Sequence, residues 1–189
     1  MKQIIENLAT IITKDNNEEK EVVVYGLERA TELFFNILTT IVLALLFGMI
    51  LETIIFAMTF FFLRSYSGGV HARNGVECYF FSTIMLATVL SLQKFEFWKV
   101  GFNNLAFFGG ILMILLIAPI GDKNKPLDEV EKKYYRKKVY QILAVIVLIY
   151  TVTTIFTVEV ITINISLAML VVSMSLILGK IKNSLTERG

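Results

Sequence analysis

Six long stretches of the chain contain no charged residue, and they constrain the fold more than any other feature. They are residues 33–51, 53–63, 79–93, 100–121, 139–158 and 160–179. All 18 basic and 16 acidic side chains are confined to the remaining, smaller part of the 189 residues. A water-soluble globule would expose long apolar faces, and disorder is excluded because so much apolar surface demands burial. The sequence therefore predicts an all-α, polytopic membrane protein.

The lengths of these stretches predict about six transmembrane helices. A spanning helix needs about 20 residues, at a rise of ~1.5 Å each, to cross a hydrocarbon core of roughly 30 Å. The last three stretches meet this length, and 33–51 is adequate. Residues 53–63 are too few alone, but a helix over about 50–67 spans if Glu52 lies at one interface and Arg64 snorkels to the other.

The stretch 79–93 is also marginal, and we expect it to continue toward an aromatic segment that suits a membrane interface. The aromatic residues there are Phe95, Phe97 and Trp98.

The basic residues predict the orientation. With six spans, residues 1–32, 64–78, 121–138 and 180–189 share one side of the membrane, and only Lys94 and Lys99 of the 18 basic residues lie on the other. Because basic loops stay in the cytoplasm, both termini are expected to be cytoplasmic.

The domain organisation predicted is a single integral membrane domain, 1–189. It comprises a cytoplasmic N-terminal region (1–32), a transmembrane bundle (33–179) with the connection 64–78 and a basic loop at 121–138, and a cytoplasmic tail (180–189). The N-terminal region begins with an amphipathic helix, because its apolar residues fall on one helical face. They are Ile4, Ile5, Leu8, Ile11 and Ile12. This helix either covers the bundle or docks a substrate.

The connection 64–78 holds the only histidine and the only cysteine of the chain, His71 and Cys78. A single cysteine in a membrane helix is usually a packing residue, and a lone histidine near an interface is usually an ordinary polar residue. Their proximity beside Gly68 and Gly69 favours chemistry instead. A thiolate nucleophile needs a neighbouring base or cation, and histidine is the usual partner.

Helix geometry sets a condition on this pair. Residues seven apart on one helix lie about 10.5 Å apart along its axis, whereas proton transfer needs about 3 Å or one bridging water. The helix must therefore break between His71 and Cys78, and Asn74-Gly75 is a turn signal in the right place. Cys78 would then open the third span, where the free N–H groups and the helix dipole favour a thiolate.

Four neighbouring residues each allow two interpretations. Glu77 either caps the helix that follows or orients His71 as a third catalytic residue. Gly68 and Gly69 form a hinge or helix contact, or bring backbone N–H groups to an oxyanion. Arg64 is a topology anchor or a group that positions an acidic substrate or a structural carboxylate.

These residues resemble a known family. The pattern Arg64-x4-Gly69-x-His71-x6-Cys78, within SGGVHARNGVEC, is similar to the signature of the accessory gene regulator B (AgrB) family of bacterial membrane cysteine endopeptidases. Tyr25-Gly26-Leu27 and the segment 118–126 also resemble the family pattern, as do the chain length and the six apolar segments.

The resemblance implies that the protein removes the C-terminal tail of an AgrD-type quorum-sensing propeptide in the bacterial cell membrane, at its cytoplasmic side. Cys78 would be the nucleophile and His71 its base, with Arg64 and Gly69 at positions needed for activity. An internal Cys or Ser of the peptide would capture the acyl-enzyme and form a thiolactone or lactone. The family resemblance also suggests a homodimer.

The basic loop has two interpretations as well. It serves topology and anionic-lipid binding, or it grips an acidic propeptide tail. Candidate substrate-binding residues are Lys123, Lys125, Lys132, Lys133 and Arg136.

Two other classes of function compete with the peptidase. One is a small multi-span transporter, although such proteins normally carry intramembrane ionisable groups or discontinuous helices, and the last two spans have no charged residue. The other is a scaffold palmitoylated at Cys78. One His and one Cys are too few for a zinc site, so no metal is expected. We also expect no other cofactor and no nucleic-acid partner.

Overall fold

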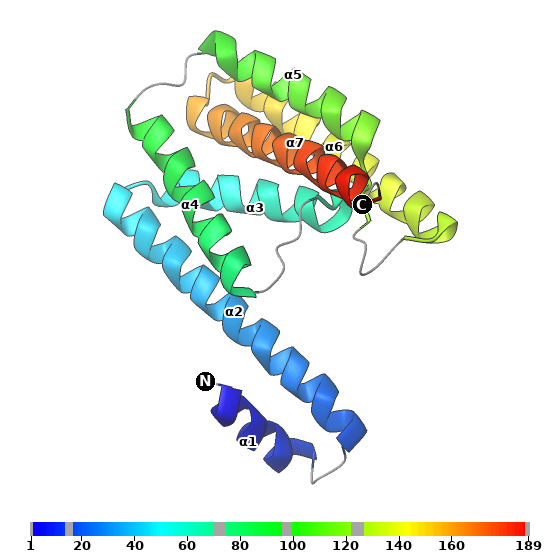
Figure 1. The fold of residues 1–189 in the computed structure, drawn as a ribbon. Coiled ribbons are helices and arrows are strands. Elements are labelled where there is room, and N and C mark those ends of the chain that lie inside the picture. The colour runs from blue at the N-terminus through cyan, green and yellow to red at the C-terminus, as the bar shows by residue number, and fades with distance from the viewer. Residues whose placement is uncertain (1, 14–16, 70–74, 96–99, 122–126, 188–189) are drawn as a thin grey trace. The chain divides into compact units, whose positions relative to one another are not determined.

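The computed structural model describes residues 2–13, 17–69, 75–95, 100–121 and 127–187, and within these ranges it is built from seven α-helices without a β-strand (Figure 1). The helices are α1 (Lys2–Thr13), α2 (Asn17–Phe47), α3 (Ile50–Ser67), α4 (Gly75–Lys94), α5 (Val100–Ile117), α6 (Glu129–Ile155) and α7 (Glu159–Glu187). The prediction of an all-α fold is confirmed.

Six of these helices are apolar enough for a membrane. Among the described residues, α2, α3, α4, α6 and α7 are long and apolar enough to cross it, and α5 contains a shorter apolar helix, Phe102–Ile117. Large apolar side chains point outward along them, such as Leu46, 72% exposed, and Leu148, 64% exposed. Exposure of this kind is favourable in hydrocarbon and unfavourable in water. Each of the six predicted apolar segments therefore corresponds to a helix in the predicted order, and five of these helices are long enough to cross a membrane.

The contacts divide the chain into two compact units. The first unit consists of Met1–Leu43 and Ala72–Ala87, and so holds α1, most of α2 and the first part of α4. The second unit consists of Ala44–His71 and Thr88–Gly189, and holds α3, α5, α6 and α7 with the last turns of α2 and α4.

The N-terminal helix α1 divides its apolar residues between two environments. Ile5, Ala9 and Thr13 recur every fourth residue and are buried, so they form the face that packs within the first unit. Ile11 and Ile12 are 74% and 58% exposed. The predicted amphipathic helix is present, but its apolar stripe is only partly covered by protein.

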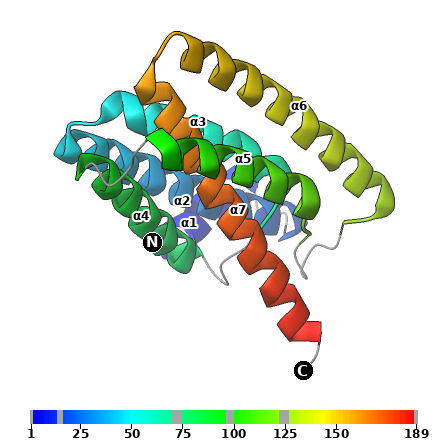
Figure 2. The same cartoon turned by 90° about the horizontal axis from the view of Figure 1, so that it is seen from above.

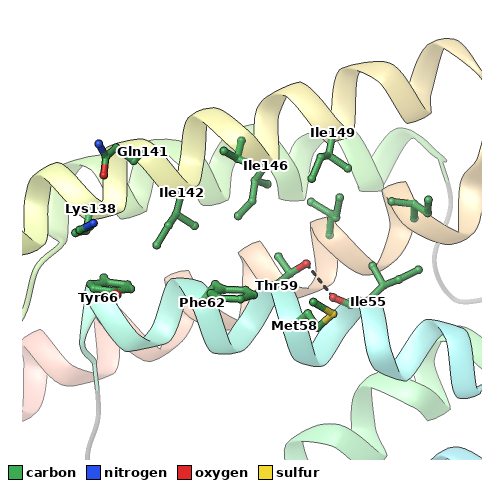
Figure 3. Close-up of a pocket in the computed structure, with 13 residues that line it drawn as sticks. Ile55, Met58, Thr59, Phe62, Tyr66, Lys138, Gln141, Ile142, Ile146 and Ile149 are labelled. Atoms are coloured by element: carbon green, nitrogen blue, oxygen red, sulfur yellow. Dashed lines mark hydrogen bonds between the residues drawn. The ribbon is translucent and has the colours of Figure 1, made fainter.

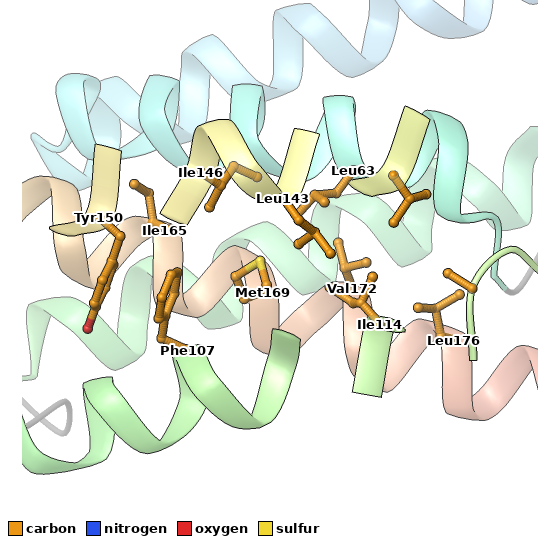
Figure 4. Close-up of a cluster of buried hydrophobic side chains, with 12 residues drawn as sticks. Leu63, Phe107, Ile114, Leu143, Ile146, Tyr150, Ile165, Met169, Val172 and Leu176 are labelled. Carbon is orange, nitrogen blue, oxygen red and sulfur yellow. The ribbon is translucent and has the colours of Figure 1, made fainter. Parts of the chain in front are cut away.

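Helix α7 is the centre of the second unit, where it packs against α5, α3 and α6 (Figure 2). The buried apolar cluster lies along it and draws on all four helices (Figure 4). Tyr150 of α6 stacks on Phe107 of α5, with ring centroids 3.6 Å apart and planes inclined by 8°. The Tyr150 hydroxyl donates to Asn104 Oδ1 over 2.7 Å, so a polar group among apolar residues is satisfied.

The buried polar residues of α7 bond within their own helix. Ser166 donates to the Thr162 carbonyl over 2.8 Å, and Ser173 donates to the Leu170 carbonyl over 2.7 Å. Asn164, fully buried, donates to the Val160 carbonyl and accepts from Gln93 of α4 over 3.1 Å. Small polar residues of this kind allow membrane helices to approach closely.

Hydrogen bonds at the two ends of the second unit show which helix ends lie together. At one end, Lys94 Nζ donates to the Phe47 carbonyl over 3.3 Å, close to where α3 begins. At the other end, the Ile120 N–H donates to the Ser67 carbonyl over 3.0 Å, and Asn183 Nδ2 donates to the Gly121 carbonyl over 3.1 Å. The end of α3, the end of α5 and the last part of α7 therefore lie together.

The fourth apolar stretch, 100–121, is about one turn longer than the helix that forms from it. Helix α5 ends at Ile117, two residues before Pro119, which follows a cis peptide bond. Proline has no N–H to continue the helical hydrogen bonds. Residues 118–121 instead run beside the end of α3, where Ile120 pairs with Gly68 in an isolated parallel bridge.

The second half of the predicted basic loop over 121–138 is helical. Helix α6 begins at Glu129, so the residues from there to 138 are helical. Asp128 accepts from the Glu131 N–H over 2.6 Å and Glu131 accepts from the Asp128 N–H over 3.3 Å. This capping box starts the helix well before its apolar part.

Two neighbouring glycines of α5 offer a test of this packing. A Cβ on Gly110 would lie 2.9 Å from the Met169 Cβ and 3.1 Å from its backbone, whereas a Cβ on Gly109 has nothing within 4 Å. We expect Gly110→Ala to destabilise the protein by about 1–3 kcal/mol through overpacking of α5 on α7. Gly109→Ala should be neutral or stabilise by up to about 1 kcal/mol. Thermal unfolding in detergent measures both, and equal behaviour of the two variants would contradict the α5–α7 contact.

Candidate active site

Cys78 lies in the first turn of α4 and is exposed. Helix α3 ends at Ser67 and α4 begins at Gly75, so the helix that carries Cys78 is not a continuation of α3. His71 belongs to residues 70–74, which lie outside the described residues. Its pairing with Cys78 stays a prediction.

A polar seam in the first unit sets the register of α4 against α2. Ser82 donates to Asn36 Oδ1 over 2.6 Å, and the hydroxyls of Thr39 and Tyr79 lie 2.6 Å apart. Hydrogen bonds between membrane helices contribute roughly 0.6–2 kcal/mol each and are directional. The two bonds therefore restrain both the rotation and the height of α4.

Glu32 of α2 lies directly over the first residue of α4. Its carboxylate occupies the space that a side chain at Gly75 would need. The same carboxylate accepts from Arg29 Nη1 over 2.6 Å. Positions 75, 78, 79 and 82 follow the i, i+3, i+4, i+7 pattern of one helix face. Cys78 thus lies along the side of α4 that contacts α2, one turn beyond Glu32.

The pair with Glu32 also affects the pKa of Arg29. Burial acts to lower its pKa, but the Glu32 carboxylate and the Tyr25 side chain together outweigh burial, so the pKa is raised above the usual value. Arg29 and Glu32 form a partly exposed ion pair at the level where α4 begins.

In the second unit, Arg64 holds the end of α3. Its Nη1 donates to the Gly68 carbonyl, just beyond the last residue of the helix. Gly68 has a φ of 75°, and a Cβ there would collide with the backbone oxygen of Ile120. Only glycine accepts both conditions, so Gly68 is required for the tight approach to the segment after α5.

Gly69 is required by its surroundings as well. Its φ is 128°, and a Cβ would collide with the Arg64 guanidinium and lie 2.8 Å from the Ser175 hydroxyl of α7. The structure thus brings Arg64, Gly68 and Gly69 together, and it adds Ser175 and Ile120 to them. The contacts explain the glycine pair by backbone conformation and packing, and they give Arg64 a positioning task within the protein.

The other predicted site residues are placed as follows. Glu77 is exposed in the first turn of α4. Lys132, Lys133 and Arg136 are exposed on the first turns of α6, where Lys132 pairs with Glu129 over 2.9 Å. Lys123 and Lys125 lie outside the described residues. Among the residues that are described, no group of three His, Cys, Asp or Glu side chains could hold a metal ion.

Sequence reasoning missed Glu32, Asn36 and Ser175. A usable signal existed for Asn36, because an amide in a charge-free stretch must find a partner inside the protein. No signal in the sequence pointed to Glu32 or Ser175, since their contacts join segments far apart in the chain.

The fold and the site define a class, a small helical membrane protein of several spans whose only cysteine opens one of its apolar helices. The chain belongs to the AgrB family, accessory gene regulator B, whose family model matches residues 2–178.

Relatives in several bacteria are similar to the chain. An AgrB-like protein of Clostridium perfringens (strain SM101 / Type A) is 32% identical over 149 residues, which cover 71% of this chain and 70% of that protein. The accessory gene regulator protein B of Staphylococcus lugdunensis is 32% identical over 118 residues, 60% of this chain and 61% of its own. An AgrB-like protein of Listeria innocua is 32% identical over 130 residues, 66% and 62% of the two chains. No solved structure matches the chain.

The contact between Glu32 and Gly75 can be tested by compensation. A methyl group at Gly75 collides with the Glu32 carboxylate, which must turn away and weaken its pair with Arg29. We therefore expect Gly75→Ala to lower the stability by at most about 1 kcal/mol. In a Glu32→Ala background the carboxylate is absent, so Gly75→Ala should cause no further loss. Gly26→Ala is the matched control, since nothing lies within 4 Å of a Cβ there. Thermal unfolding measures the two single variants, the double variant and the control, and an additive double variant would disprove the contact.

Proposed function

We propose that this protein is a membrane cysteine endopeptidase that removes the C-terminal tail of an AgrD-type quorum-sensing propeptide and promotes its cyclisation. The observation that carries the proposal is the exposed Cys78 in the first turn of α4, in a chain that the AgrB family model matches over residues 2–178. An exposed cysteine at the start of a helix is accessible to a peptide on the membrane surface.

The proposed reaction has two acyl transfers. His71 takes the proton of the Cys78 thiol, and the sulfur attacks the carbonyl carbon of the scissile peptide bond. The C–N bond breaks, the tail leaves as an amine that receives the proton from His71, and the peptide stays on Cys78 as a thioester. A thiol or hydroxyl of the same peptide then attacks the thioester, which closes the ring and releases the Cys78 sulfur.

The second transfer is nearly balanced when the incoming group is a thiol, because one thioester replaces another. The first transfer, from amide to thioester, is uphill, so water must be kept from the acyl-enzyme. Phe80 and Phe81 follow Cys78 within one helical turn and are 59% and 56% exposed. Rings of this kind enter the hydrocarbon of the bilayer, where water is scarce.

Arg64, Gly68 and Gly69 act in this proposal as positioning residues. The Arg64 guanidinium bonds the Gly68 carbonyl, three residues before His71, and thereby directs the chain that leads to the base. Glu77 keeps two roles in the proposal, as a favourable first-turn carboxylate of α4 or as a partner that orients His71.

The proposed location is the bacterial cell membrane, with the site on its cytoplasmic side. The end of α3 lies beside the first turns of α6, since the rings of Tyr66 and Tyr135 are 6.1 Å apart, and these turns carry Lys132, Lys133 and Arg136. Basic residues stay in the cytoplasm. They would also attract an acidic propeptide tail to the same surface.

Substitution of the proposed catalytic pair tests the chemistry. We expect Cys78→Ala and His71→Ala each to abolish cleavage of a propeptide in vesicles, while membrane insertion is unchanged. Because Cys78 is the only cysteine of the chain, the acyl-enzyme adds the mass of the truncated peptide at a single position. Mass spectrometry of the quenched reaction should find it there in the wild type and not in Cys78→Ala. Intact cleavage in either variant would refute the mechanism, and absence of cleavage by the wild type would favour a transporter or scaffold.

Charge reversal tests the recognition of the tail. The double variant Lys133→Glu/Arg136→Glu on α6 should slow tail removal roughly threefold to tenfold, because two exposed ion pairs are lost. The effect should shrink at high salt. Lys180→Glu/Lys182→Glu changes the net charge equally on α7 and is the control. If both variants cleave at the wild-type rate, these residues serve topology alone.

A further inference from the structure

The second unit contains an apolar groove that the proposed reaction does not use. It lies between α3 and α6, with α7 as its floor, and has a volume of about 610 Å³ (Figure 3). Proteins use cavities of about 300–1,000 Å³ for small ligands. Met58 and Phe62 of α3 and Val145 of α6 line it, and they are 55%, 48% and 56% exposed. The groove is therefore open along the outer face of spanning helices, where the bilayer lies.

The polar groups of the groove gather at one end. Lys138, Gln141 and Tyr66 line that end, and Figure 3 shows them grouped on one side of the apolar stretch. Thr59 lies further along, but its hydroxyl donates to the Ile55 carbonyl of its own helix over 2.8 Å. The rest of the lining is apolar. The groove is thus amphipathic along its length, with a cation at one end.

The groove has the length of one leaflet. Its lining on α3 runs from Ile55 to Tyr66, and on α6 from Lys138 to Ile149, or about 16 Å at a rise of ~1.5 Å per residue. Half of a hydrocarbon core of roughly 30 Å is about 15 Å. The polar end lies beside the end of α3 and at the point where the charged first part of α6 gives way to its uncharged stretch, which places Lys138 at the level of the lipid headgroups.

We infer that this groove binds one anionic phospholipid, with an acyl chain between α3 and α6 and its phosphate at Lys138 and Gln141. Within the described chain, neither of these two side chains has a hydrogen bond or an ion pair, and Lys138 only lies over the Tyr134 ring at 5.7 Å. Their donors are available to a phosphate, which accepts strong charge-assisted hydrogen bonds from a cation. The charge at the end of the groove selects an anionic lipid over a zwitterionic one.

The site is separate from the proposed chemistry at Cys78, so either conclusion can fail without the other. Its polar end includes Tyr66, which directly precedes Ser67 and the Arg64–Gly68 contact. A bound lipid would pack against the last turn of α3.

Two adjacent lysines provide the first test. Lys138 lines the groove and Lys137 does not. Purified protein in detergent is titrated with phosphatidylglycerol or with phosphatidylcholine of the same acyl chains, and bound lipid is measured by native mass spectrometry. We expect tighter binding of phosphatidylglycerol, with Kd raised about fivefold in Lys138→Gln and unchanged in Lys137→Gln. Equal binding of the two lipids, or equal loss in both variants, would overturn the proposal.

Filling the groove provides the second test. Val145 lines the groove and Leu148, one turn further along α6, does not, although both are more than half exposed. Val145→Trp should displace the lipid, and Leu148→Trp should retain it, with thermal unfolding as the check that both variants fold. Phosphatidylglycerol with a photoreactive acyl chain should label peptides of α3 or α6. Labelling elsewhere, or a Val145→Trp variant that separates two copies of the chain without loss of lipid, would show that the groove has another occupant.

Discussion

The structure depends on one constraint, that hydrocarbon offers no hydrogen-bond partner to a polar group. The spanning helices satisfy their own backbone, and their hydroxyls follow the same rule. Thr53 donates to the Met49 carbonyl and Thr151 to the Val147 carbonyl. No buried side-chain nitrogen or oxygen in the described part of the chain lacks a partner. A polar residue that cannot bond within its own helix must therefore bond to another helix.

Interhelical polar contacts consequently determine which helices pair and at what height. Asn36 joins α2 to α4 through Ser82, and Asn164 joins α7 to Gln93 of α4. Apolar packing alone would hold these helices together weakly in lipid, because the hydrophobic effect does not act between them there. Within the first unit, the Ser82–Asn36 bond holds the part of α4 that carries Cys78 against α2. The Gly68-Gly69 segment is held instead by the Arg64 side chain and by the backbone of Ile120.

Much of this could be predicted from the sequence. Charge-free stretches predict spans because length and charge alone decide whether a helix is stable in a bilayer. The break before Cys78 follows from Asn74-Gly75. The end of α5 could also have been found, since Pro119 stops a helix, and so could the start of α6, since Asp128 and Glu131 form a capping box. Because the spans are delimited by charge alone, the fourth predicted span extends past Pro119, and the predicted loop includes the helical residues 129–138.

The sequence by itself determined that the protein lies in a bilayer, where its long apolar helices run, and which segment holds the only histidine and cysteine. These follow from local properties: the hydropathy of a stretch, the charge around it, and the spacing of a motif. Tertiary structure alone decided that Glu32 covers Gly75, that Arg64 and Ser175 enclose Gly69, and that a groove between α3 and α6 ends at Lys138. Each of these joins helices distant in the chain, and such contacts depend on how side chains of different helices interlock, which no local pattern encodes.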